Sequence, residues 1–202
     1  MASPLFDINK QKEQKLSAEF KSKYLNKHFE KLEQFARDLT RLPEPEECFF
    51  LQTENSFNAF TFIPLVTEKQ AVKHLYASTY SISRRVINAL IELHQEGLID
   101  AITLLISDSL IKRNPVTVDN LIAVSAQYAN IKIKFAWNHS KIALLQTSDN
   151  YYCIEGSGNW SENAHLEQYC FTNSKQVYEF RKRIFNETKI RYIADGGELR
   201  TN

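Results

Sequence analysis

Short apolar runs alternate along this chain with amphipathic stretches of helical period, and this alternation constrains the fold more than any other feature. A compact apolar run predicts a strand, whereas an apolar stripe that repeats at three and four residues predicts a helix. Strands that alternate with helices indicate an α/β fold, with a mixed β-sheet sandwiched by helices. The predicted strands are residues 48–51, 59–66, 74–79, 101–106, 131–137, 141–145, 151–154 and 168–172. The predicted helices are residues 84–97, 118–128 and 176–185.

Two of these elements carry strong local signals. Residues 101–106 are almost continuously apolar, as expected of a strand buried on both faces. Gly97 stands where a helix C-cap belongs. Asp119 is expected to help start the helix over 118–128.

The chain divides by composition into three parts. Residues 1–42 carry apolar side chains at three- and four-residue steps, which predicts an N-terminal helical extension. We expect it to lie on the core, and the alternative is a dimer or partner contact. The LPEPEE sequence of residues 42–47 predicts a turn or linker. Residues 46–193 form the predicted main domain, and residues 194–202 are expected to be a frayed tail.

Composition and charge exclude several classes of protein. A hydrophobic fraction of 43% and a charged fraction of 24% over 202 residues are ordinary for a globular chain with a sizeable core. The net charge of +1 argues against a protein that coats nucleic acid through its overall charge, but permits a local basic patch. The three cysteines form no CxxC pair, so neither a zinc site nor a disulfide framework is expected. We expect a reducing, cytoplasmic location with no signal peptide and no membrane span.

One dense polar constellation stands out between residues 138 and 172. His139 and Lys141 are two positions apart at the start of a predicted strand, so they share a face. A second predicted strand ends in the Gly-Ser-Gly-Asn sequence of residues 156–159. A histidine can act as a nucleophile or as a general acid and base near neutral pH. A lysine, an asparagine, a serine and glycine N–H groups can stabilise negative charge on a phosphodiester. No carboxylate cluster suited to a pair of Mg²⁺ ions accompanies them, which favours a metal-free reaction.

At these residues the chain resembles the phospholipase D superfamily, whose signature is HxK followed by GSxN. The resemblance extends over about residues 46–185 and implies the phospholipase D-like fold. It implies that His139 attacks phosphorus and forms a phosphohistidine, while Lys141 and Asn159 hold the phosphate oxygens, with no metal and no cofactor. It also implies that an acid beyond the GSxN segment orients the histidine, and Glu167 best matches that position. A second histidine, from another copy of the motif, protonates the leaving group.

Two departures from the family pattern bear on activity. The family places an aspartate five residues after the lysine, where this chain has Gln146. The chain also carries a single HxK. Small single-motif members solve the second problem by forming a homodimer with one composite site, and most of them are nucleases. The resemblance therefore implies a homodimer in which two His139 side chains meet across a twofold axis.

Three functions remain open from the sequence. The first is a metal-independent endonuclease that acts on DNA or RNA. The second is a catalytically degenerate module that binds nucleic acid, as the change at Gln146 would allow. The third is a phospholipid-acting enzyme, and the absence of hydrophobic loops and membrane helices argues against it.

The substrate contacts can also be anticipated. Ser157 is expected in the catalytic set, and the N–H groups of Gly156 and Gly158 are expected to approach the substrate. Trp160 either stacks on a base or packs beneath the loop, and Trp137 is a further aromatic near a strand end. A set of basic residues is expected to gather near His139 if it forms a phosphate-binding surface: Lys112, Arg113, Lys132, Lys134, Lys141, Arg181, Lys182 and Arg183.

Overall fold

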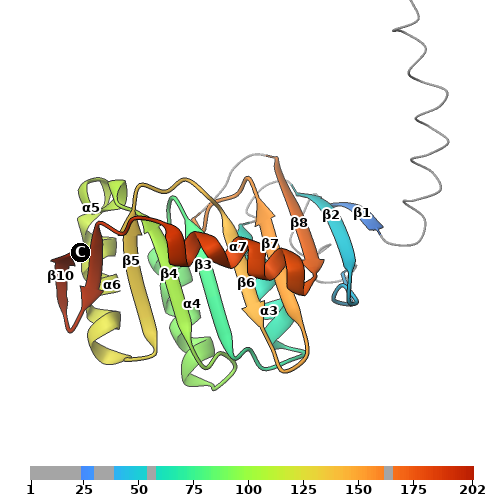
Figure 1. Ribbon diagram of the computed structural model, residues 1–202, viewed down its shortest axis with the longest axis horizontal. Helices are drawn as coiled ribbons and strands as arrows, with labels where there is room; N and C mark the ends of the chain where they lie inside the picture. Colours follow the sequence, from blue (N-terminus) through green and yellow to red (C-terminus); the bar gives the residue numbers. More distant parts are fainter. Residues whose placement is uncertain (1–23, 30–38, 54–57, 162–165) are drawn as a thin grey trace, which may run out of the picture.

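The computed structural model describes the backbone of residues 24–29 and the whole of residues 39–53, 58–161 and 166–202, which form one large mixed sheet flanked by helices (Figure 1). The order across the sheet is β1-β2-β8-β7-β6-β3-β4-β5-β9-β10. The strands are β1 (Tyr24–Phe29), β2 (Glu47–Thr53), β3 (His74–Thr79), β4 (Ile102–Ser107), β5 (Ile131–Ala136), β6 (Ile142–Gln146), β7 (Tyr151–Gly156), β8 (Glu167–Asn173), β9 (Tyr192–Asp195) and β10 (Glu198–Thr201). The α/β architecture predicted from the sequence is confirmed.

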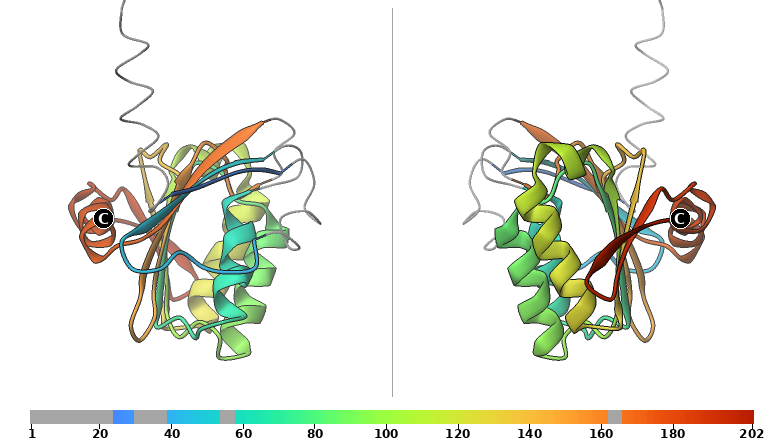
Figure 2. Two further views of the ribbon diagram at one scale, coloured as in Figure 1. Left: turned by 90° about the vertical axis from the view of Figure 1, so that its right-hand side faces the viewer. Right: turned by 90° about the vertical axis from the view of Figure 1, so that its left-hand side faces the viewer.

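The helices cover both faces of the sheet. Helices α3, α4 and α6 lie on one face, and α7 lies on the other (Figure 2). The helical elements are η2 (Ala59–Thr61), α3 (Phe62–Thr67), α4 (Arg84–Gln95), α5 (Ser109–Arg113), α6 (Pro115–Gln127) and α7 (Lys175–Glu187). Among the described residues, no helix has both the length and the apolar character needed to cross a membrane.

The two strong local signals are both confirmed. All six residues of β4 are buried, because the central strands have helices on both faces. Helix α4 begins after Ser83, whose hydroxyl accepts a hydrogen bond from the N–H of Val86. Gly97, at φ +73°, adopts the left-handed conformation that ends the helix.

Residues 59–66 are helical, so the predicted strand is wrong. The side chain of Asn58 accepts a hydrogen bond from the N–H of Phe60 and begins η2, which continues into α3. Pro64 falls in the first turn of α3, where a missing N–H costs nothing. Phe62 and Val66 are fully buried against the sheet. A short apolar run suits a buried helix as well as a strand, and the cap decides in favour of the helix here.

Helix α6 starts earlier than predicted. Asn114 caps it by accepting a hydrogen bond from the N–H of Thr117 at 3.2 Å, and Pro115 occupies the first helical position. Asp119 is therefore inside the helix, and it does not start it.

Residues 24–29 form a strand within the stretch predicted to be helical. Their backbone pairs in parallel with β2, from Tyr24 opposite Cys48 to Phe29 opposite Thr53. The edge of β2 offers backbone N–H and C=O groups with which another strand can pair, and this pairing outweighs the local helical pattern. The remaining parts of the predicted extension, residues 1–23 and 30–38, lie outside the described residues.

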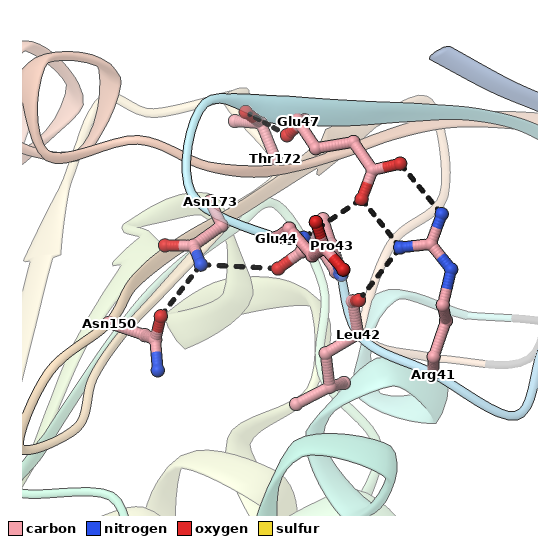
Figure 3. Close-up of polar contacts among 8 residues, drawn as sticks. All are labelled: Arg41, Leu42, Pro43, Glu44, Glu47, Asn150, Thr172 and Asn173. Atoms are coloured by element: carbon pink, nitrogen blue, oxygen red, sulfur yellow. Dashed lines mark hydrogen bonds and ion pairs between the residues drawn. The ribbon is translucent and has the colours of Figure 1, made fainter. Parts of the chain in front are cut away.

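The predicted turn over residues 42–47 is confirmed and is tied to the sheet (Figure 3). The Arg41 guanidinium donates two hydrogen bonds to the Glu47 carboxylate, at 2.6 and 2.7 Å, and lowers the pKa of Glu47. The side-chain amide of Asn173 in β8 donates to the carbonyl oxygen of Pro43 at 3.1 Å. The N–H of Glu44 donates to Glu47 at 2.8 Å. This segment is therefore an anchored turn and not a flexible linker.

The expected frayed tail over 194–202 is instead an ordered hairpin. Strand β9 pairs with β5 and with β10, and Gly196 and Gly197 supply the positive φ angles of the turn between them. The exposed edge of β5 accounts for this order, because it needs a pairing partner. The folded unit thus continues beyond residue 193.

Candidate active site

The candidate site lies at one edge of the central sheet. Strands β3, β4 and β5 run parallel, so their carboxyl ends meet at the same edge. Tyr80, Asp108 and Trp137 directly follow these three strands. His139 lies in the loop that joins β5 to β6. In open α/β sheets, ligands bind outside the carboxyl ends of the strands.

A buried asparagine fixes the loop that carries His139. The side-chain amide of Asn138 donates to Ser78 Oγ at 2.9 Å and to the carbonyl oxygen of Leu105 at 3.1 Å. Its Oδ1 accepts from the N–H and the hydroxyl of Ser140, at 3.0 and 2.7 Å. These bonds tie the loop to both β3 and β4. The backbone on either side of the exposed His139 is therefore held in place.

His139 and Lys141 form a direct pair. The Nζ atom of Lys141 lies 3.0 Å from Nδ1 of His139 and 2.9 Å from its carbonyl oxygen. Burial lowers the pKa of Lys141, and the Glu167 carboxylate opposes that shift. The sequence predicted that these two side chains share a face, and the structure shows a direct contact between them.

An aromatic ring and an arginine flank the histidine. The centroid of the Tyr80 ring lies 4.7 Å from that of His139. The guanidinium of Arg113 lies 4.2 Å from the centroid of Tyr80 and donates to the Tyr80 carbonyl oxygen at 3.3 Å. Arg113 is therefore a cation of the predicted basic set that the structure brings close to His139.

The three cations of the basic set that lie on α7 have other partners. Arg181 forms an ion pair with Glu155 at 2.7 Å, and Arg183 pairs with Glu187 within α7. Lys182 lies over the rings of Tyr76 and Tyr178. The cations of α7 thus do not gather at His139, which corrects the expectation, because each is drawn to an acid or ring beside its own helix.

The glycine-containing loop packs tightly against β8. A Cβ atom on Gly156 would overlap the carbonyl oxygen of Gln168 and approach Cδ1 of Tyr169 to 2.5 Å. The N–H of Ser157 donates to the Gln168 carbonyl oxygen at 3.0 Å. Gly158 is buried. Gly156 is thus required by close packing between strands.

Glu167 contacts Ser157 in this chain. The hydroxyl of Ser157 donates a short hydrogen bond to the Glu167 carboxylate and accepts one from the N–H of Gln168 at 3.0 Å. The resemblance implied that Glu167 orients His139. The structure gives Glu167 a hydroxyl partner and places its charge near Lys141, and its role toward His139 stays a prediction.

Trp160 packs beneath the loop, which settles the alternative left open by the sequence. Its side chain is 0% exposed, so it cannot stack on a base. Its N–H donates to the Ser81 carbonyl oxygen at 3.0 Å, and its carbonyl oxygen accepts from Ser83. These bonds hold the partly buried Asn159 beside the segment that follows Tyr80.

Trp137 is a candidate site residue that the sequence marked only as an aromatic residue near a strand end. Its side chain is 84% exposed, and the guanidinium of Arg191 lies 5.8 Å from its ring centroid. Arg191 is itself held by Asp108 at 2.6 Å. The available signal was the position of this aromatic residue, two places before His139.

A groove opens beside Lys141 on the α7 side of the sheet. Its volume is about 920 Å³, and it runs across β7, β8 and β2. Its lining includes Phe50, Lys141, Glu155, Gln168 and Cys170. Within the part of the chain that the structure describes, no three His, Cys, Asp or Glu side chains are grouped as a metal ion requires.

The chain resembles known proteins in its fold and not in its sequence. No protein-family model matches the sequence, and no curated protein is significantly similar to it. Among solved structures, the chain is similar to a phosphatidylserine synthase from Haemophilus influenzae Rd KW20, with a TM-score of 0.50 and 12% identity over 71% of this chain. It is also similar to a polyphosphate kinase from Porphyromonas gingivalis, with a TM-score of 0.53 and 11% identity over 70% of this chain. The fold is phospholipase D-like.

This chain is much shorter than these two neighbours. It spans 39% of the synthase and 26% of the kinase. A weaker likeness, with a TM-score of 0.46, is to TrmBL2, an archaeal chromatin protein. The two TM-scores show a shared fold, and a shared fold does not imply a shared reaction.

Proposed function

We propose that this phospholipase D-like chain is a metal-independent phosphodiesterase that cleaves nucleic acid through a phosphohistidine, at a site shared by two copies. The observation that carries the proposal is the contact between an exposed His139 and the Lys141 ammonium, at an open edge of the sheet. The names of the two structural neighbours, a synthase of a phospholipid and a kinase, are consistent with chemistry at phosphate groups.

The first proposed step transfers the phosphoryl group to the protein. Nε2 of one His139 attacks phosphorus, so that an N–P bond forms and the P–O bond to the leaving hydroxyl breaks. His139 of the second copy donates its proton to the leaving oxygen. In the second step this imidazole takes a proton from water, the resulting hydroxide attacks phosphorus, and the N–P bond breaks.

The observed hydrogen bond indicates the tautomer of a neutral His139 before substrate binds. An ammonium can only donate, so Nδ1 of His139 accepts from Lys141, and a neutral ring then carries its proton on Nε2. The acid copy needs a second ring proton, because only an imidazolium that delivers its Nε2 proton is left as a neutral imidazole. In that copy Nδ1 also carries a proton and no longer accepts from Lys141. In the nucleophilic copy Nε2 must be free, so there the ring proton lies on Nδ1 and Lys141 turns to the phosphate oxygens.

Other residues would stabilise charge on phosphorus. Lys141 supplies a positive charge, and Asn159 and the N–H groups near Gly158 supply donors. Ser157 and Glu167 are hydrogen-bonded to each other, so we assign Ser157 the role of positioning the Glu167 carboxylate. The Glu167 carboxylate in turn opposes the lowering of the Lys141 pKa by burial.

The position of Gln146 favours an enzyme over a degenerate binding module. Lys141 precedes β6, and Gln146 is the last residue of that strand. Five residues of extended chain span about 16 Å. Gln146 is therefore at the opposite edge of the sheet from His139, where it pairs with Tyr151 and His74. A change at this position does not remove a group from the site.

The test is cleavage of plasmid, single-stranded DNA and RNA in excess EDTA. We expect the wild-type chain and the Lys69→Ala control, which changes an exposed lysine away from the site, to cleave. His139→Ala should be inactive while keeping its fold by circular dichroism. No cleavage of any substrate, or cleavage only with added Mg²⁺, would contradict the proposal.

A mixing experiment tests the shared site. Excess His139→Ala, allowed to exchange subunits with the wild type, should suppress activity in proportion to the fraction of mixed dimers. Excess Lys69→Ala should not suppress it. If His139→Ala has no effect and sedimentation shows a monomer, the two-copy mechanism is wrong.

A further inference from the structure

We propose that Trp137 is a base-stacking platform beside the scissile phosphate, and that the substrate is therefore a single-stranded nucleic acid. This inference rests on the proposed function, because it places the stacked base next to His139. The evidence for it is the exposure of Trp137 and the contacts around it, which do not depend on the histidine chemistry.

The chain buries one tryptophan and exposes the other. Trp160 is 0% exposed, whereas Trp137 is 84% exposed. Tryptophan is the largest apolar side chain, and most of its surface is normally buried in a folded protein. An exposed tryptophan at the edge of a candidate site offers a large apolar face that a ligand can cover.

The exposure of Trp137 does not come from a loose loop. The preceding residue, Ala136, is buried at the end of β5. The following residue, Asn138, is buried and bonded to Ser78 and Leu105 in two neighbouring strands. Both neighbours fix the backbone, so the ring is presented on a rigid support. A preorganised aromatic ring binds a base at a small entropic cost.

A cation is held next to the ring. The Arg191 guanidinium lies 5.8 Å from the centroid of Trp137. Asp108 holds that guanidinium at 2.6 Å, and the backbone N–H of Arg191 donates to the Phe135 carbonyl oxygen at 2.8 Å. A stacked base brings its own phosphate, which an arginine next to the ring can receive.

Two aromatic–arginine pairs lie near His139, one in space and one in sequence. The ring centroid of Tyr80, which Arg113 covers, lies 4.7 Å from that of His139. Trp137, with Arg191 next to its ring, stands two residues before His139. The Cα atoms of Trp137 and His139 are at most about 7.6 Å apart, since two peptide units separate them. This places the Trp137 ring within reach of a nucleotide adjacent to the one cut at His139.

The platform selects for unpaired bases. Bases in a duplex are already stacked on both faces, so a ring can receive one only after it is flipped out. Bases of a single strand are free to stack on an aromatic side chain, with little dependence on sequence. Trp137 thus favours single strands and does not specify a base.

The experiment measures binding without cleavage. The full chain with His139→Ala is titrated with oligothymidylate and with a duplex of the same length, and tryptophan fluorescence is recorded. Oligothymidylate should quench the emission of Trp137, and the buried Trp160 should remain unquenched. Adding Trp137→Ala should weaken single-strand binding by about 5- to 100-fold, as loss of one stacked base does. Duplex binding should be unchanged.

Phe180→Ala is the matched control, because Phe180 is another exposed aromatic residue, 59% exposed, on α7. It should leave single-strand binding unchanged.

Equal losses for single strand and duplex, no loss with Trp137→Ala, or dissociation of a dimer by Trp137→Ala in sedimentation would overturn the inference. A preference for phospholipid vesicles over oligothymidylate would overturn it too. If Trp137→Ala loses single-strand binding but the wild type cleaves nothing, the proposed function fails while the stacking site stands.

Discussion

The Nζ atom of Lys141 lies 3.0 Å from Nδ1 of His139, in the loop between the end of β5 and the start of β6. The Lys141 ammonium also donates to the carbonyl oxygen of His139 at 2.9 Å. A single cation therefore holds both the ring and the backbone of the candidate catalytic histidine. A substitution of Lys141 therefore tests the role of this cation directly.

Replacing Lys141 should reduce cleavage without unfolding the chain. We expect Lys141→Ala to lower kcat/KM in EDTA by about 100- to 1000-fold, as removal of one transition-state donor does. Lys141→Arg keeps the charge and should retain part of the activity. Lys69→Ala is the control. Wild-type activity in Lys141→Ala would exclude a role for this ammonium.

Asn138 should be a stability determinant of the His139 loop. Asn138→Ala leaves the carbonyl oxygen of Leu105 and the N–H of Ser140 without their partner. We expect a loss of about 2–4 kcal/mol in the free energy of unfolding. Urea denaturation checks this value, and amide exchange should accelerate at Ser140. Asn186→Ala, at an exposed site on α7, should cause no loss.

Gly156 should not tolerate even one methyl group. In Gly156→Ala the new Cβ atom meets the backbone of Gln168 and the ring of Tyr169, so β7 and β8 must separate. We expect a loss of about 2–3 kcal/mol by chemical denaturation. Gly97→Ala is the matched comparison, because nothing lies within 4 Å of its Cβ and only the cost of positive φ, about 1–2 kcal/mol, applies. A smaller loss at Gly156 than at Gly97 would contradict the packing argument.

His74 should make stability depend on pH. Burial, with the positive charges of Lys182 and Lys132, lowers the pKa of His74 to about 4. The unfolded chain has a histidine pKa of about 6.5. Between these two values only the unfolded state takes up the proton, so the free energy of unfolding falls as pH falls from about 6.5 to about 4, by about 2 kcal/mol.

Comparison with His74→Gln isolates this effect from the titration of carboxylates. The variant should lose less stability than the wild type over the same pH range in thermal or urea denaturation. Identical pH dependence of the two proteins would show that His74 does not titrate as described.

Cys170 should be the reactive thiol. Its Sγ atom lies 3.0 Å from that of Cys48, and the hydrogen bond from Cys48 lowers the pKa of Cys170. Iodoacetamide should therefore modify Cys170 first, as peptide mapping can show. Cys48→Ala should slow the reaction, whereas Cys48→Ser keeps a donor and should slow it less. Cys153 is buried, which raises its pKa, and it should react only after unfolding. Faster labelling at Cys153 than at Cys170 would contradict this order.

Sequence patterns predicted those elements whose local signals are consistent. The all-buried β4 and the capped α4 follow directly from an apolar run and from a stripe that ends at Gly97. The prediction failed where two structures suit one pattern. Residues 59–66 are apolar enough for a strand, yet Asn58 starts a helix there. Residues 24–29 pair with the edge of the sheet, although their sequence predicted a helix. Residues 192–201 form a hairpin at the other edge, where a frayed end was predicted.

The sequence by itself determined the α/β fold and the spacing that joins His139 to Lys141, because side-chain period and turn residues are properties of neighbouring positions. Only the tertiary structure decided that Trp160 is buried while Trp137 faces solvent, and that Glu167 contacts Ser157. Exposure and contact depend on which distant segment packs against a residue. For Trp160 that segment is the one after Tyr80, and for Trp137 it is the arginine before β9, more than 50 residues further along the chain.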